Sequence, residues 1–295
     1  MHHLESVKYP ESLVVTRICA RAQGGDAVKG IYKRFEIVAI CVTLAWSVGA
    51  HAQDDTDTKG GSYDSNRILG IGLQRLPAWP GAENSRNVVV PFVHLELPWH
   101  ITLSTYDGAT VDFIHSDGWH GGLYANFTWG RDRSELHPPP LDAMDSFSSR
   151  INAGGYIEHD FTSWLSVGTD LSHDIGGSGA YWRVYSTVGL PSIWYYMHEF
   201  ELQWQGTNGA AMRRNFGVTP VQAQALGVDP WQPGAGSQEA VIQYSAFMPT
   251  SLHTGFALSI NYARLIGSAG DSPLVRKYGS PNQLTSTLAF VYRFL

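Results

Sequence analysis

Short segments in which apolar and polar side chains alternate follow one another from residue 66 to the end of the chain. In one of them Trp119, Leu123 and Trp129 belong to one phase, while His120 and Tyr124 belong to the other. Side chains on a β-strand have a period of two, so each segment is predicted to be a strand with one apolar face. No helical periodicity longer than a few turns interrupts the series. The sequence therefore predicts an all-β fold.

The connections between these segments alternate between short and long. Twelve strands are predicted, near residues 66–75, 88–97, 99–105, 110–115, 119–130, 150–160, 163–174, 180–190, 193–205, 239–248, 252–266 and 283–294. Even-numbered connections are as short as "SDG", "FTS" and "PTS", whereas most odd-numbered ones are long, including "GRDRSELHPPPLDAMDSFSSR". A total of twelve strands requires that the segment "WHITLSTYDGATVDFIH" forms two strands, separated at Asp107-Gly108. This dipeptide favours a hairpin turn. This pattern is typical of a closed antiparallel transmembrane β-barrel.

A large soluble β-sandwich would also have alternating strands, but two features favour the barrel. Aromatic residues recur at both ends of the apolar phase, about ten residues apart, which is the length of a tilted membrane-crossing strand. The opposite phase is small and polar or charged, as expected of a barrel lumen. The predicted aromatic girdle consists of Trp119, Trp129, Trp194, Trp204, Tyr292 and Phe294.

The chain ends on an alternating segment, "QLTSTLAFVYRFL". Lipid offers no hydrogen-bond partners to an open sheet edge, so the last strand of a membrane barrel is expected to pair with the first. Tyr292 and Phe294 also resemble the C-terminal signal that the barrel assembly machinery recognises. With both termini in the periplasm, the short turns are predicted to be periplasmic.

The apolar run near the N-terminus has the pattern of a secretory signal peptide. Lys29, Lys33 and Arg34 precede an apolar stretch, and Ala50-His51-Ala52 provides a small-x-small cleavage site. Residues 1–52 are therefore predicted to be a lead-in and signal peptide, 53–65 a polar periplasmic segment, and 66–295 the barrel. Both cysteines, Cys19 and Cys41, lie before the predicted cut, so the mature chain is expected to have no disulfide and no thiolate metal site.

Charged residues occur in the predicted lumen phase: Glu158, Asp160, Asp170, Arg183, Glu199, Glu201 and Arg293. Either a salt-bridge network that plugs the barrel or a cation-preferring wall would suit them. The network is favoured, since Tyr156, Tyr185 and Tyr195 are also expected to fill the lumen. The formal net charge of -6 gives no indication of nucleic-acid binding.

Several segments resemble the MipA/OmpV family of Gram-negative outer membranes. They are "ILGIGLQRLPAWPGAENSRNVVVPFVHLEL", "FTWGRDRSE", "NFGVTPVQAQALGVDPWQPGAG" and "GDSPLVRKYGSPNQLTSTLAFVYRF". The resemblance implies a porin-like outer-membrane barrel that acts as a scaffold in peptidoglycan assembly, bridging a murein lytic transglycosylase and a murein synthase. Relatives described as adhesins or antibiotic-induced proteins leave other roles open.

The leading prediction is thus a non-enzymatic scaffold that contacts outer-membrane lipid and lipopolysaccharide. A narrow channel for small solutes is the alternative, and a barrel enzyme or adhesin is the third. His173-Asp174, with Asp170 nearby, is more simply a polar loop anchor than a catalytic pair, and no catalytic, cofactor-binding or metal-binding residue is predicted. Arg213 and Arg214 either contact lipopolysaccharide phosphates or lie on a solvated loop. The acidic residues of the periplasmic segment, a predicted partner site, are Asp54, Asp55, Asp57 and Asp64.

Overall fold

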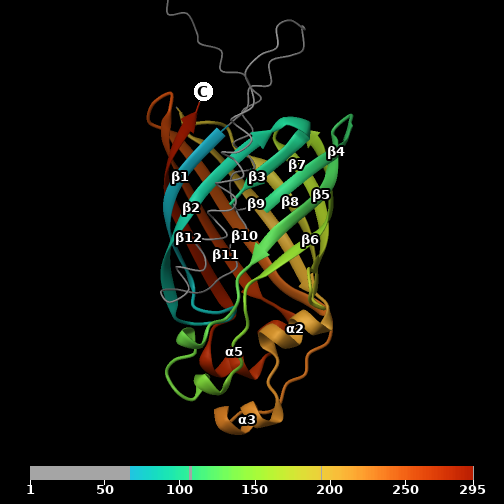
Figure 1. The fold of residues 1–295 in the computed structure, drawn as a ribbon, viewed down its shortest axis with the longest axis vertical. Coiled ribbons are helices and arrows are strands. Elements are labelled where there is room, and N and C mark those ends of the chain that lie inside the picture. Colours follow the sequence, from blue (N-terminus) through green and yellow to red (C-terminus); the bar gives the residue numbers. More distant parts are fainter. Residues whose placement is uncertain (1–66, 106–107, 194, 295) are drawn as a thin grey trace, which may run out of the picture.

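The computed structural model describes residues 67–105, 108–193 and 195–294. Within these ranges twelve antiparallel strands form a closed barrel, in which every strand pairs with its neighbours in the chain and β1 pairs with β12. At that closure Arg67 lies opposite Phe294. Figure 1 shows the tilted strands, with the C-terminus at one end and helical loops at the other. The predicted twelve-stranded closed barrel is confirmed.

The observed strands agree with the predicted ones to within a few residues at most ends. They are β1 (Arg67–Pro77), β2 (Ser85–Leu97), β3 (Ile101–Ser104), β4 (Gly108–Ser116), β5 (Trp119–Thr128), β6 (Arg150–Thr162), β7 (Leu165–Asp174), β8 (Ala180–Gly189), β9 (Met197–Thr207), β10 (Gly236–Pro249), β11 (Thr254–Leu265) and β12 (Asn282–Phe294).

The division at Asp107-Gly108 is confirmed, because β3 and β4 pair antiparallel with Ser104 opposite Gly108. Gly108 has a φ of +83°, and a Cβ atom there would lie 2.0 Å from the carbonyl oxygen of Ala125. Only glycine fits this close approach between the start of β4 and the neighbouring strand β5. Asp107 itself lies outside the described residues.

Two predicted strand starts were wrong. Trp99 and His100 belong to the short 3₁₀ turn η2 (Pro98–His100), with positive φ values of 65° and 56°. The connection between β8 and β9 is longer than residues 191–192, the gap between the two predicted strands, because β9 begins only at Met197. Tyr195 falls in this connection and is 69% exposed, so it does not fill the lumen as predicted.

The outward phase of the barrel is mainly apolar. On β12 it consists of Leu284, Leu288, Phe290, Tyr292 and Phe294, all exposed, whereas Gln283, Thr285, Thr287, Ala289 and Val291 are buried inside. The same arrangement exposes Leu73 on β1, Leu123 on β5 and Leu171 on β7. An apolar surface on this scale is unusual for a protein surrounded by water and suits contact with lipid. None of the helices in the described ranges is long and apolar enough to cross a membrane.

Candidate functional site

Four long connections fold together at one end of the barrel into what we call the loop cap: residues 78–84, 129–149, 208–235 and 266–281. It contains the 3₁₀ turns η3 (Arg133–Glu135) and η4 (Leu141–Ala143), and the helices α2 (Gly209–Phe216), α3 (Pro220–Leu226), α4 (Gly267–Gly270) and α5 (Pro273–Tyr278). Figure 1 shows these elements gathered at the end opposite the C-terminus. The long connections predicted from the sequence therefore form a small structured unit.

The two longest cap helices begin and end at residues suited to those positions. The side chain of Asn208 accepts a hydrogen bond from the amide of Ala211 and caps α2. Thr219 and Gln222 form a reciprocal capping box at the start of α3, with Pro220 at its first position. Gly227, with a φ of +61°, ends α3 in the left-handed conformation that glycine adopts at little cost.

The loop cap has a hydrophobic core of its own, to which all four connections contribute. Trp79 comes from the first connection, Leu136 and Met144 from the second, Val218 from the third and Leu274 from the fourth, and each is at most 1% exposed. A second cluster joins α2 to the end of β11 and to the last connection through Met212, Phe216, Leu265, Ala269 and Val275. Burial from four separate segments makes the cap one packed body.

Hydrogen bonds fasten the cap to the barrel. The Gln283 side chain on β12 accepts from the amide of Gly81 at 3.0 Å and donates to the carbonyl of Ala82 at 3.2 Å. Within the cap, the Ser272 hydroxyl donates to the carbonyl of Phe216 at 2.7 Å. Arg86 on β2 forms an ion pair with Glu135. The first connection is thus held across the mouth of the barrel.

Arg131 is the most deeply buried charged residue of the cap, at 2% exposure. Its guanidinium donates to the main-chain carbonyls of Asp145 at 3.0 Å and Asn215 at 3.2 Å, and it lies over the ring of Phe147. Burial lowers the pKa of Arg131 to about 10, an effect that the Asp145 carboxylate partly offsets. The residue is therefore still charged at neutral pH and joins the second and third connections.

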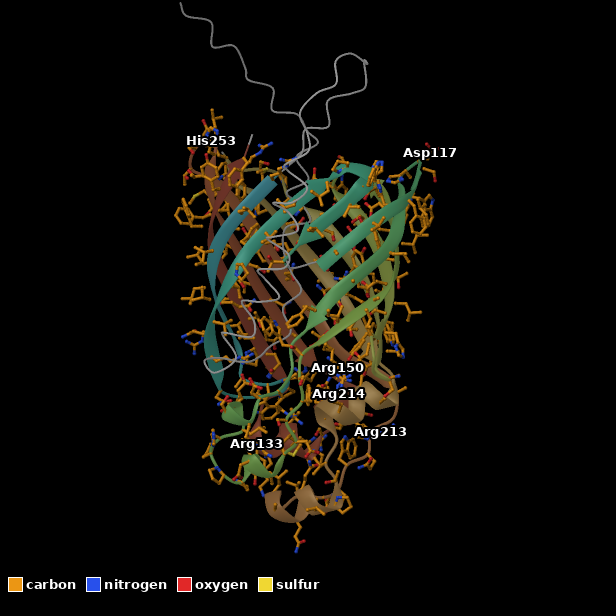
Figure 2. All side chains as sticks on the ribbon, in the orientation of Figure 1. Asp117, Arg133, Arg150, Arg213, Arg214 and His253 are labelled. Atoms are coloured by element: carbon orange, nitrogen blue, oxygen red, sulfur yellow. The ribbon has the colours of Figure 1, made fainter. Side chains whose placement is uncertain are left out.

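Asp174 is a structural anchor where the barrel meets the cap. Its carboxylate accepts from Arg214 at 2.6 Å, from the Tyr181 hydroxyl at 3.1 Å and from the amide of Gly179 at 3.1 Å. Figure 2 shows Arg150, Arg213 and Arg214 in this region, with Asp117 and His253 at the opposite end. His173 is exposed whereas Asp174 is buried, as the alternation of a strand requires. The two side chains therefore do not face one reacting group together.

Charged and phenolic side chains on strands β4 to β9 form a network on the lumen side of the barrel wall. Arg183 donates to Asp170 at 2.7 Å and to Glu201 at 3.0 Å, joining β7, β8 and β9. The Tyr124 hydroxyl donates to Asp170 at 3.0 Å, and that of Tyr185 donates to Glu158 at 2.7 Å. Tyr156 also bonds to Asp112. The structure thus brings four of the seven predicted lumen charges into one interior region.

The other predicted site residues lie apart from this network. Glu199 is buried, Asp160 is half-exposed and pairs with His120 at 2.8 Å near the short turns, and Arg293 is half-buried close to the C-terminus. Of the aromatic girdle, Trp119, Trp204, Tyr292 and Phe294 are exposed on the outer face and Trp129 is half-buried. Trp194 and the acidic residues Asp54, Asp55, Asp57 and Asp64 lie outside the described residues.

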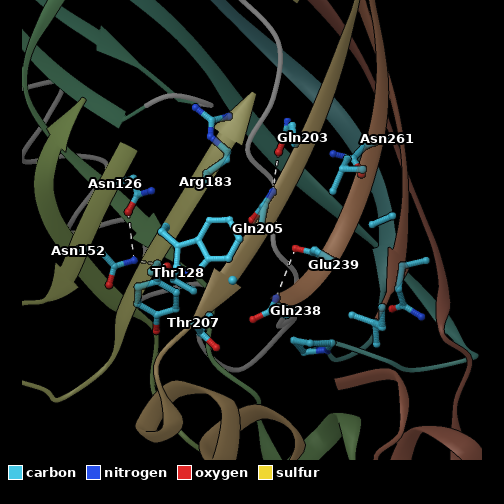
Figure 3. A pocket seen from close by; sticks show the side chains of 18 of the residues that line it. Asn126, Thr128, Asn152, Arg183, Gln203, Gln205, Thr207, Gln238, Glu239 and Asn261 are labelled. Carbon is cyan, nitrogen blue, oxygen red and sulfur yellow. Dashed lines mark hydrogen bonds between the residues drawn. The ribbon is translucent and has the colours of Figure 1, made fainter. Parts of the chain in front are cut away.

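Between the network and the cap lies a cavity of about 110 Å³. Pro77, Trp79, Pro80 and Gly81 line its cap side, and the strand ends contribute mainly amide and hydroxyl side chains, shown in Figure 3: Asn126, Thr128, Asn152, Gln203, Gln205, Thr207, Gln238 and Asn261. A β-bulge at Ser237/Glu239 on β10 allows the consecutive residues Gln238 and Glu239 both to be buried here. Sequence analysis missed this site, because isolated Asn, Gln and Thr in a lumen phase give no motif.

A family model described as "MltA-interacting protein MipA" matches residues 69–294. The chain belongs to the MipA family. Family membership and the closed barrel with its apolar outer face identify an outer-membrane β-barrel protein, as the sequence predicted.

Solved outer-membrane barrels resemble the fold at very low sequence identity. A NanC porin is 10% identical, covers 78% of this chain and 100% of its own, and has a TM-score of 0.36. An outer membrane channel from Pseudomonas putida F1 is 9% identical over 82% of this chain and 100% of its own, with a TM-score of 0.37. OmpT of Vibrio cholerae is 6% identical over 82% of this chain and 100% of its own, with a TM-score of 0.33. No curated protein matches the chain.

Proposed function

We propose that this protein is a closed outer-membrane scaffold that holds a murein lytic transglycosylase and a murein synthase together from the periplasmic side. The observation that carries the proposal is the loop cap, whose packed core is fastened across one mouth of the barrel. A scaffold functions with a covered lumen, whereas a general pore does not. The family description, an MltA-interacting protein, supports a murein hydrolase as the partner.

The partner site is proposed to combine the short turns with residues 53–65. A stable interface buries about 800 Å² on each partner, more than turns of a few residues present. Asp54, Asp55, Asp57 and Asp64 make the segment acidic, so a basic partner surface is expected. Attraction between exposed charges is screened by salt, so complex formation should weaken as ionic strength rises.

A crosslinked pull-down from cell envelopes tests this proposal. We compare the complete chain with a variant that lacks residues 54–64, and verify in each that the barrel is inserted and heat-modifiable. The deletion is expected to reduce co-purification of the murein hydrolase and synthase without loss of the barrel. Full retention of both partners would contradict the assigned binding segment, and absence of murein enzymes from both samples would contradict the scaffold.

A narrow channel for small solutes is the second candidate, favoured by the cavity beneath the cap and by the excess of carboxylates over guanidinium groups among the described lumen residues. A catalytic barrel has less support, since Asp174 is engaged by Arg214 and Tyr181. Conductance in planar bilayers separates the scaffold from the channel.

A further inference from the structure

The hydrogen-bonded wall of the barrel is shorter at the β3–β4 hairpin than on either side of it. Strand β2 has 13 residues, but β3 pairs with it only from Leu97 to His94, and the hairpin turns back between Ser104 and Gly108. Figure 1 shows β3 confined to the end away from the loop cap. On the cap side of this turn, no strand among the described residues pairs with the free edge of β2.

The direction of the backbone groups of β2 identifies the residues at this free edge. Val93 donates to the Thr105 hydroxyl at 2.8 Å and accepts from the Thr105 amide at 2.9 Å, so its N–H and C=O point toward the hairpin. Successive residues of an antiparallel strand point these groups to opposite sides, so Pro91, Val89 and Asn87 point theirs the same way as Val93, beyond the hairpin turn. Proline has no N–H to donate and is confined to strand edges. Pro91 thus stands where β2 loses its neighbour, and its ring opposes the addition of another strand.

The free edge lies where the lipid-facing surface ends. The outward residues of the neighbouring strand β1 run from Arg67 through Leu73 to Arg75, all exposed. The strand rises roughly 20–26 Å between the two arginines, allowing for tilt, which is close to the apolar band of such barrels. Val89 lies opposite Leu73 and is 68% exposed. Asn87, the next outward residue of β2, lies opposite Arg75, so the free edge crosses the membrane boundary on the cap side.

An unpaired edge at this depth requires a partner that is both apolar and polar. Hydrocarbon cannot satisfy backbone groups, and Pro91 disfavours another protein strand as the partner. The exposed side chain of Val89 offers apolar contact. Arg75 is exposed and, among the described residues, its guanidinium has no ion-pair partner, so it is available for a phosphate group. Together these features match a lipid with acyl chains, hydroxyl groups and a phosphate.

We infer that lipid A, the phosphorylated lipid of the outer leaflet, binds in the gap between β2 and residues 126–128, where β5 extends past its last pair with β4. Its phosphate binds Arg75, and an acyl chain lies along Val89 and Pro91. At the hairpin turn three strand spacings, about 14 Å in all, separate β2 from β5, which leaves room for acyl chains. The inference rests on the proposed orientation, with the cap at the cell surface, and not on the murein partners.

Native mass spectrometry of the full chain, stripped of lipid in detergent and titrated with lipid A, tests the inference. Arg75→Gln should weaken lipid A binding about 3–10-fold, because it removes one charged contact with phosphate. Arg67→Gln is the matched control, since Arg67 is exposed on the same face of the same strand but at the opposite membrane boundary, and its substitution should leave binding unchanged. Phosphatidylglycerol, a phosphate lipid without hydroxyacyl chains, should bind more weakly than lipid A.

A second pair of variants tests the gap itself. Val89→Trp fills the gap and should also weaken lipid A binding, whereas Val184→Trp, on a strand paired along both edges, should not. Heat modifiability verifies that each variant is a barrel. Three outcomes would overturn the inference: unchanged binding in Arg75→Gln; equal losses in the gap and control variants, which means that lipid coats the barrel without a site; or tighter binding of phosphatidylglycerol than of lipid A. No murein enzyme takes part, so failure here leaves the scaffold proposal standing.

Discussion

At the level of single residues, Arg131 joins two connections of the loop cap through buried hydrogen bonds. It is buried and donates to carbonyls in two connections, so Arg131→Met would leave those acceptors without partners. We expect the cap to lose about 2–4 kcal/mol of stability against local opening while the barrel stays intact. Limited proteolysis within residues 208–235, compared with heat modifiability, measures both effects.

Arg133→Met is the control, because Arg133 is exposed and also donates to cap carbonyls, those of Asp142 at 2.7 Å and Met144 at 3.4 Å. Its substitution should cost less than about 1 kcal/mol, since water can replace the lost bonds. Similar protease sensitivity in both variants would show that burial of Arg131 is not what holds the cap.

A second residue-scale prediction concerns the two faces of β8. Val184 is 47% exposed on the outer face near the middle of the strand, so Val184→Arg places a guanidinium against lipid. This should cost about 2–4 kcal/mol. Thr187→Arg should cost less, because Thr187 faces the lumen in register with Glu201 on β9. Urea unfolding in lipid vesicles measures both, and equal losses would contradict the assignment of faces.

At the level of elements, the strands could be predicted because each one separates lipid from a largely polar lumen. Apolar and polar side chains therefore alternate along the strand with a period of two. On β12, the exposed Leu284 and Leu288 alternate in this way with the buried Gln283, Thr285 and Thr287. The cap could not be predicted in this way, since its core residues are spread over four connections and touch only after folding. The helix α3 did leave a local signal, the capping box of Thr219 and Gln222 followed by Gly227.

The candidate site, too, could be predicted from the sequence only in part. The lumen network was foreseeable in part, because opposite charges such as Asp170 and Arg183 share the inward phase of neighbouring strands. The cavity was not, because Asn152, Thr207 and Gln238 meet only through barrel closure and a bulge on β10. Tyr195 was misplaced because the connection before β9 proved longer than the sequence pattern suggested.

An element-scale prediction follows from the two unlike ends of the barrel. The residues from 67 onward contain no cysteine, so a single introduced cysteine reports its own position. Gln224→Cys on α3 and Asp229→Cys are exposed on the cap and should react with a membrane-impermeant maleimide on intact cells. Ser192→Cys, exposed in the turn between β8 and β9, should react only after permeabilisation. Labelling of Ser192→Cys on intact cells would reverse the proposed orientation.

At the scale of the whole molecule, barrel closure and cap attachment reinforce each other. Strand β12 pairs with β1 and also holds the first cap connection through Gln283. The cap therefore rests on the seam where the first and last strands meet, and the Arg183 network joins lumen side chains of β7, β8 and β9. We expect the packed loops of the cap and the paired charges of the lumen wall to act as barriers to free passage of solutes.

The last prediction tests these barriers by conductance in planar bilayers. The complete protein should conduct little, while replacement of residues 209–233 by a short Gly-Ser linker removes α2 and α3 and should raise the conductance. Adding Arg183→Ala should raise it again and favour cations, because Asp170 and Glu201 then lose their shared partner. Heat modifiability confirms that each variant is still a barrel. If the complete protein already conducts as well as the linker variant, the cap is no barrier, and the channel should replace the scaffold as the leading function.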